Sequence, residues 1–166
     1  QQFFWLYNET SNTNFQVKAT LQYVGEHAYY WVQEDVPFKP RELKKLADIF
    51  DQKIYPANRA FFGSEWTPGV DGDPRIHILY ARDIGASIAG YYSSADEVPT
   101  QANEYSNQRE IFIFNADNVD LTGDFTYGVL AHEFQHMIHW NQDRNEESWL
   151  NEGFADLAAY LNDFDI

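Results

Sequence analysis

The stretch VLAHEFQHMIHW, residues 129–140, decides the fold, because it combines the apolar character of a core helix with three histidines. With successive residues about 100° apart on a helix, His136 lies about 40° around from His132, so both imidazoles project to one side, one turn apart. Two histidines and Glu133 on one flank of a buried helix are costly without a partner. The stretch therefore predicts a buried helix, running from about 125 to 140, that carries a polar site.

Residues 132–136 read HEFQH, which is the pattern HExxH. Neutral imidazole is a good zinc ligand, so His132 and His136 are the first two candidate metal ligands. Glu133 lies beside the first ligand on the same flank, where it is placed to hold and deprotonate a zinc-bound water rather than to bind the ion. HExxH also arises by chance, and a catalytic site needs a third protein ligand.

His139 and the metzincin pattern are two candidates for that third ligand. His139 lies about 20° around the helix from His132, but three ligands on one straight helix approach an ion from one side only. We expect His139 to pack beside the site instead. The metzincin pattern HExxHxxGxxH requires glycine at position 139 and histidine at position 142, where this chain has His139 and Gln142.

A carboxylate on a following helix is the third candidate. Glu152, in WLNEGFAD, falls 16 residues after His136, which is enough chain to end one helix, turn and return antiparallel. The expected second helix covers 149–164. Asp156 lies one turn beyond Glu152 on the same face, where it can accept a hydrogen bond from a ligand histidine and select its tautomer.

HEFQH followed by WLNEGFAD resembles the gluzincin zinc peptidases, whose signature is HExxH plus a later glutamate in an NExxxD-like motif. The segment FFGSEWTPGVDGDPRIHILYA, residues 61–81, is similar to hyicolysin-like secreted bacterial metallopeptidases. The resemblance implies a zinc-dependent endopeptidase acting on protein or peptide substrates. In it, His132, His136 and Glu152 bind Zn²⁺, Glu133 is the general base, and Asp156 orients a histidine.

The same resemblance implies that the strand EIFIFNAD, residues 110–117, is a sheet edge to which an extended peptide adds. An ordinary core strand is the alternative. Gluzincins usually supply a second oxyanion donor, often from a C-terminal subdomain. This sequence ends ten residues after Asp156. We therefore expect residues 1–166 to be a single zincin-like catalytic subdomain that lacks the C-terminal subdomain, with a C-terminal segment of the same precursor as a partner. Tyr160, Tyr127 and His139 are the candidate donors within the chain.

Two alternatives to an endopeptidase remain. WLNEGFA also resembles the zinc aminopeptidases, which would make the chain an exopeptidase. Those enzymes carry a GxMEN segment, and the only methionine here is Met137. The other alternative is a non-catalytic, zinc-stabilised binding domain. Such a domain has no need of Glu133, and closed structural zinc sites usually have four protein ligands.

Composition excludes several classes. With 44% apolar residues the chain can form a core, and without cysteine it has neither disulfides nor a cysteine-based zinc site. A net charge of −15 argues against binding nucleic acid or anionic membranes. No apolar run is long enough to span a membrane, and the start QQFFWLYNET resembles a processed, secreted chain. DGD (71–73) with Asp83 is a candidate Ca²⁺ site, with plain turn chemistry as the alternative.

The remaining pattern indicates an α+β fold, with a small mixed sheet, an active-site helix and a second ligand-bearing helix. Alternation predicts a hairpin and two further strands, whereas apolar residues at spacings of three and four predict a helix from Pro40 that Pro56 ends. A long irregular loop covers 83–107. The expected strands are 15–24, 27–34, 75–81 and 110–117.

Overall fold

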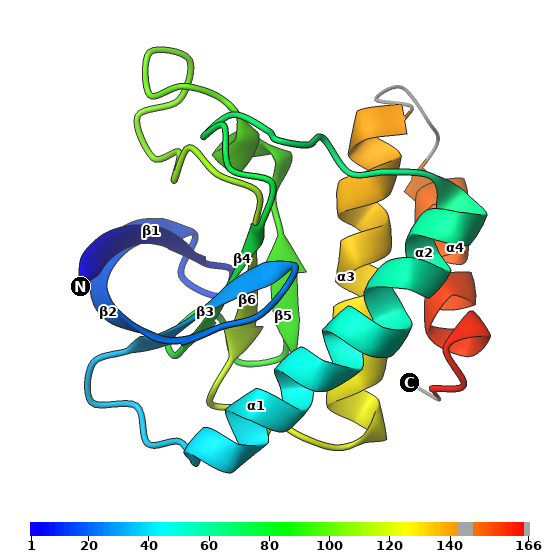
Figure 1. Ribbon diagram of the computed structural model, residues 1–166. Coiled ribbons are helices and arrows are strands. Elements are labelled where there is room, and N and C mark those ends of the chain that lie inside the picture. The colour runs from blue at the N-terminus through cyan, green and yellow to red at the C-terminus, as the bar shows by residue number, and fades with distance from the viewer. Residues whose placement is uncertain (143–147, 165–166) are drawn as a thin grey trace.

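The computed structural model describes residues 1–142 and 148–164, and its architecture is α+β and zincin-like, as expected. The strands are β1 (Gln2–Asn8), β2 (Thr13–Val24), β3 (Ala28–Gln33), β4 (Ile76–Ala81), β5 (Gly90–Tyr92) and β6 (Ile111–Asn115). The helices are α1 (Pro40–Ile49), α2 (Tyr55–Phe62), α3 (Asp124–Gln142) and α4 (Ser148–Leu161). All four helices lie on one side of the sheet, and α3 lies between the sheet and α4 (Figure 1).

The sheet is mixed and has the order β1-β2-β3-β4-β6-β5. The predicted hairpin is confirmed as β2 and β3, which pair antiparallel, and the two further predicted strands are β4 and β6. β3, β4 and β6 are parallel to one another, whereas β5 pairs antiparallel with β6. β1, which the sequence did not reveal, extends the hairpin along β2.

The expectation that residues 110–117 form the sheet edge is wrong. β6 lies inside the sheet, between β4 and β5, and the edge strand is β5. β5 falls within the segment that was expected to be loop, and it pairs with β6 through Tyr91 opposite Ile113. A strand of three residues is too short to show readable alternation, so the sequence alone did not reveal it.

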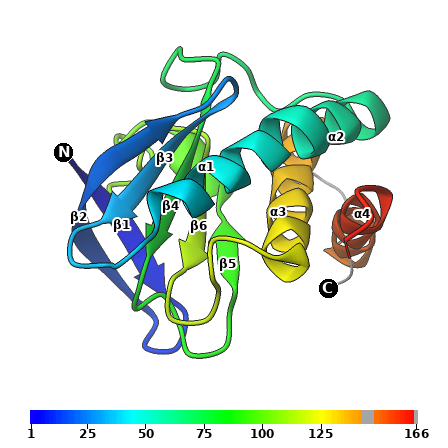
Figure 2. The same ribbon diagram turned by 60° about the horizontal axis from the view of Figure 1, so that its bottom comes forward.

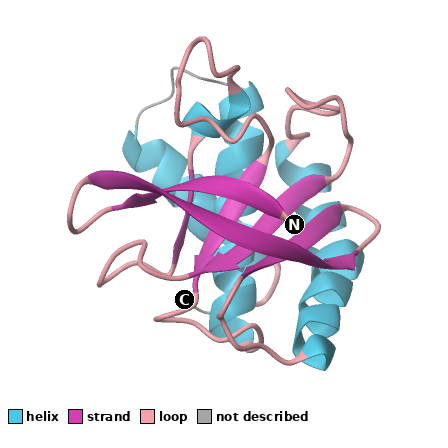
Figure 3. Cartoon of the chain, turned by 90° about the vertical axis from the view of Figure 1, so that its left-hand side faces the viewer, coloured by secondary structure: helices cyan, strands magenta, loops and turns pink. Residues whose placement is uncertain are grey.

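Each face of the sheet is covered by its own core. On the helix side, Tyr30, Ile78, Phe112 and Phe114 pack with the apolar residues of α1 and α3. On the opposite side, the β1–β2 ribbon curls across the sheet (Figure 3) and encloses a second core. Every residue of β4 and β6 is buried, as expected for parallel strands covered on both faces.

The expectation that Pro56 ends the first helix is also wrong. The helix passes through a π-helical segment, Phe50–Ile54, and continues as α2 to Phe62 (Figure 2). Pro56 lies in the first turn of α2, a position that tolerates a missing backbone N–H. The rings of Phe50 and Tyr55 lie 5.2 and 5.4 Å from that of Phe134 on α3, so this long helical segment holds α3 against the sheet.

Candidate metal centre

Two neighbouring helices bring the predicted ligands together. α4 returns antiparallel beside α3 (Figure 1), as the spacing between His136 and Glu152 suggested. One nitrogen from each of His132 and His136 and one carboxylate oxygen of Glu152 all lie within 4.8 Å of one another. This is the group in the described part of the chain that has the composition of a metal site.

The distances inside the group fit a single tetrahedral ion. The Nε2 atoms of His132 and His136 are 3.1 Å apart, and they lie 3.4 and 3.0 Å from the carboxylate oxygens of Glu152. Ligand atoms held by one tetrahedral zinc at its usual bond lengths are separated by about 3.3 Å. The donor set of two imidazoles and one carboxylate is also one that catalytic zinc uses. The residues present therefore fit Zn²⁺.

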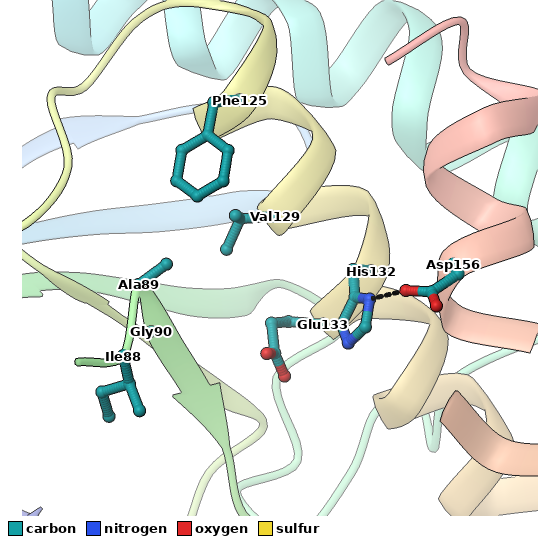
Figure 4. A pocket seen from close by; sticks show the side chains of 8 residues that line it. All are labelled: Ile88, Ala89, Gly90, Phe125, Val129, His132, Glu133 and Asp156. Carbon is teal, nitrogen blue, oxygen red and sulfur yellow. Dashed lines mark ion pairs between the residues drawn. The ribbon is translucent and has the colours of Figure 1, made fainter. Parts of the chain in front are cut away.

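Asp156 approaches the first histidine from behind. Its Oδ1 lies 3.1 Å from Nδ1 of His132 (Figure 4). A proton on Nδ1, which the nearby carboxylate favours, would leave the Nε2 lone pair free for an ion. The side chains of Glu152 and Asp156 are 61% and 68% exposed, so the α4 side of the group is open to solvent.

Glu133 lies in a cavity next to the ligand group rather than within the group itself. Burial, and secondarily the charge of Glu152, raises the pKa of Glu133 to about 8. A cation bound by the neighbouring ligands would favour the carboxylate and lower that pKa. The structure thus places the carboxyl group of Glu133 at the cavity, beside the two histidines, with a pKa raised into the neutral range.

The cavity lies between β5 and α3 and has a volume of about 410 Å³. Figure 4 shows its lining residues. The apolar ones are Ile88, Ala89, Gly90, Phe125 and Val129, and the polar ones are His132, Glu133 and Asp156. At Gly90 a Cβ would lie 2.5 Å from the carbonyl oxygen of Ile113, so the close strand pairing there requires glycine. The strand β5 itself was not predicted, although loops as long as 83–107 are usually functional or flexible.

None of the three candidate oxyanion donors lines this cavity. Tyr160 lies on α4 one turn beyond Asp156 and is 76% exposed. Tyr127 is buried, with its ring 5.6 Å from that of Phe164. His139 is buried on α3, with its ring 5.8 Å from that of Phe154, and it is not part of the metal group.

The residues of the candidate calcium site are not brought together. Asp71 and Asp73 precede β4 and Asp83 follows it, so a strand about 20 Å long separates them. Asp73 accepts hydrogen bonds from the Tyr29 hydroxyl and the backbone N–H of Arg75. The structure therefore agrees with the alternative expectation, in which these aspartates accept hydrogen bonds in a turn.

Comparison with known proteins supports a metallopeptidase family. No protein-family model matches the chain. The chain is similar to the neutral metalloprotease ShpI of Staphylococcus hyicus, with 29% identity over an alignment of 173 positions that covers 93% of this chain and 38% of the relative. It thus spans about two fifths of the length of that curated relative. In the described residues, no helix is both long and apolar enough to cross a membrane.

Proposed function

We propose that this chain is the catalytic subdomain of a secreted, gluzincin-type zinc endopeptidase of the hyicolysin-like kind. One observation carries the proposal: the three ligand atoms of His132, His136 and Glu152 converge beside a cavity that also holds Glu133. The similarity to a neutral metalloprotease supports the same reaction class.

In this proposal His132, His136 and Glu152 hold one Zn²⁺, and Asp156 keeps His132 in the ligating tautomer. Bound zinc supplies a Lewis acid that polarises the scissile carbonyl and acidifies water. Glu133 takes the proton of the attacking water on its carboxylate and then delivers it to the nitrogen of the leaving amine.

The substrate is held along β5. Its outer edge carries no strand partner in the described part of the chain, and the first residues of this wall face Glu133 across the cavity (Figure 4). An extended peptide adds to such an edge through main-chain hydrogen bonds. The apolar residues at the start of α3 that line the cavity, Phe125 and Val129, then contact an apolar side chain of the peptide.

A second group that stabilises the oxyanion is still required. Because Tyr160, Tyr127 and His139 do not line the cavity, we assign this donor to a further segment of the same precursor that covers the open side of the site. Secretion rests on the resemblance to secreted bacterial metallopeptidases.

The test is Glu133→Gln, which keeps the shape of the side chain and removes its basicity. Both proteins should contain about one zinc per chain, and cleavage of casein or a quenched peptide should fall about 1,000-fold in the variant. Glu104→Gln, at an exposed glutamate outside the cavity, is the matched control and should cleave at the wild-type rate. Bound zinc without Glu133-dependent cleavage would favour the non-catalytic zinc-stabilised domain.

A further inference from the structure

Two asparagine side chains hold the segment that enters β5, residues 85–89. This segment contributes Ile88 and Ala89 to the cavity wall opposite Glu133. Besides the asparagines, the side-chain oxygen of Thr10 accepts a hydrogen bond from the N–H of Ala86 at 3.0 Å. What holds these residues therefore decides how the wall faces the site.

Asn115, the last residue of β6, is fully buried and makes most of these bonds. Its side-chain amide nitrogen donates to the carbonyl oxygens of Gly85 at 2.9 Å and Ile88 at 2.8 Å. Its backbone N–H donates to the carbonyl oxygen of Ala89 at 2.8 Å. Its side-chain oxygen accepts from the N–H of Asp117 at 3.1 Å, so both ends of the amide are used.

Asn118 reinforces the same carbonyl from the solvent side. Its amide nitrogen donates to the carbonyl oxygens of Ile88 at 2.9 Å and Ala86 at 3.2 Å. The Ile88 carbonyl thus accepts from two asparagines at once. This fixes the peptide plane between Ile88 and Ala89 and, with it, the direction in which the start of β5 presents its main chain.

We propose that Asn115 is a positioning residue for peptide binding, which sets the orientation of the β5 wall relative to Glu133. The inference rests on the proposed function and deepens it. Asn115 touches neither the ligands nor the cavity in the structure, so it acts only through residues 85–89. The hydrogen bonds that Asn115 and Asn118 donate to residues 85–88 form a clamp on the segment that enters β5. The metal group is built on α3 and α4 and does not depend on this clamp.

The experiment compares two inhibitors on the zinc-loaded protein. Acetohydroxamate reaches only the metal, whereas a peptidyl hydroxamate also extends along β5. Asn115→Asp keeps the side-chain shape and the bond from Asp117 but removes both donated bonds. We expect zinc content and acetohydroxamate affinity to stay at wild-type values, while peptidyl hydroxamate affinity falls about tenfold, as the loss of one to two hydrogen bonds implies.

Asn118→Asp changes an exposed residue, so it tests the same clamp even where the buried variant fails to fold. It should lower the affinity for the peptidyl hydroxamate as Asn115→Asp does, but by about threefold. The matched control is Asn107→Asp. Asn107 also donates two side-chain bonds, to the carbonyl oxygen of Trp5 and the carboxylate of Asp96, but none to residues 85–89, so the ratio of the two inhibitor affinities should not change.

An equal ratio of the two affinities in the wild type, Asn115→Asp and Asn118→Asp overturns the positioning role and leaves the proposed function intact. A fall in the ratio for Asn107→Asp as large as that for Asn115→Asp also overturns it, because general destabilisation would then explain the effect. A wild-type protein that binds neither inhibitor overturns the proposed function itself, and the positioning role with it.

Discussion

At the scale of single residues, burial changes the pKa of acidic side chains in this protein. Asp96 lies in the loop after β5, where its carboxylate accepts hydrogen bonds from the backbone N–H and side-chain amide of Asn107 at 2.9 and 3.0 Å. Burial raises the pKa of Asp96 to about 7, even though these bonds favour the charged form. The folded protein therefore binds this proton more tightly than the unfolded chain, whose aspartate has an ordinary pKa.

This carboxyl should make stability depend on pH. Because its folded-state pKa is raised, Asp96 contributes stability at low pH that is lost as the pH rises from about 4 to about 7. Asp96→Asn keeps an oxygen acceptor for Asn107 and removes the charge. The free energy of unfolding of the variant, measured in urea, should exceed that of the wild type increasingly over this range and by at least about 1 kcal/mol at pH 8. A difference that does not change with pH would contradict this account.

At the scale of elements, different turns of α3 contribute apolar and polar residues to the cavity. Its apolar N-terminal turns carry Phe125 and Val129 at one end of the cavity, and its middle carries His132 and Glu133 at the other. Phe125 is 51% exposed, which is unusual for a large aromatic residue on a helix with so many buried residues. Because Phe125 lines the cavity, a side chain bound there would contact its ring.

Phe125→Ala should therefore change selectivity more than stability. We expect kcat/KM for quenched peptides with a large apolar side chain at the cavity position to fall about tenfold, and that for peptides with alanine there to change little. Phe61→Ala removes another exposed phenylalanine, on α2 and outside the cavity, and serves as the control. Equal losses for both peptides would show that Phe125 does not contact the substrate side chain.

At the scale of the whole molecule, the metal group ties α4 to the rest of the fold. His132 and His136 belong to α3, which the sheet and the α1–α2 segment hold, whereas Glu152 belongs to the outer helix. A ligand that binds only the folded protein stabilises it by RT ln(1 + L/Kd), where L is the concentration of free ligand. Metal binding here should therefore stabilise the complete chain as well as equip the site.

Removal of the metal should consequently lower the melting temperature. At a zinc concentration of about 100 times Kd the stabilisation is about 2.7 kcal/mol, which corresponds to a shift of roughly 8 °C for a chain of this size. Differential scanning calorimetry before and after EDTA measures it. Glu152→Ala should lose most of the shift, and a shift of wild-type size in that variant would contradict Glu152 as the third ligand.

Much of the candidate site was predictable because its signals are local. The spacing of His132 and His136 places two imidazoles on one helical face in any helix, and the connection to Glu152 is long enough for a return. Helices α3 and α4 and strands β2, β3, β4 and β6 were predictable because their apolar patterns are long. Pro56 misled the prediction, since its tolerance in a first helical turn depends on the π-helical segment before it.

The sequence by itself determined the candidate metal group, the glutamate beside it and the mixed sheet that carries the helix. Periodicity and chain length suffice for these, since they act over one or two turns or strands. Only the tertiary structure decided the cavity wall opposite Glu133. β5 pairs with β6, and the segment that enters β5 is bonded to Asn115, more than twenty residues further along the chain. Contacts between such distant residues have no signature in either segment alone.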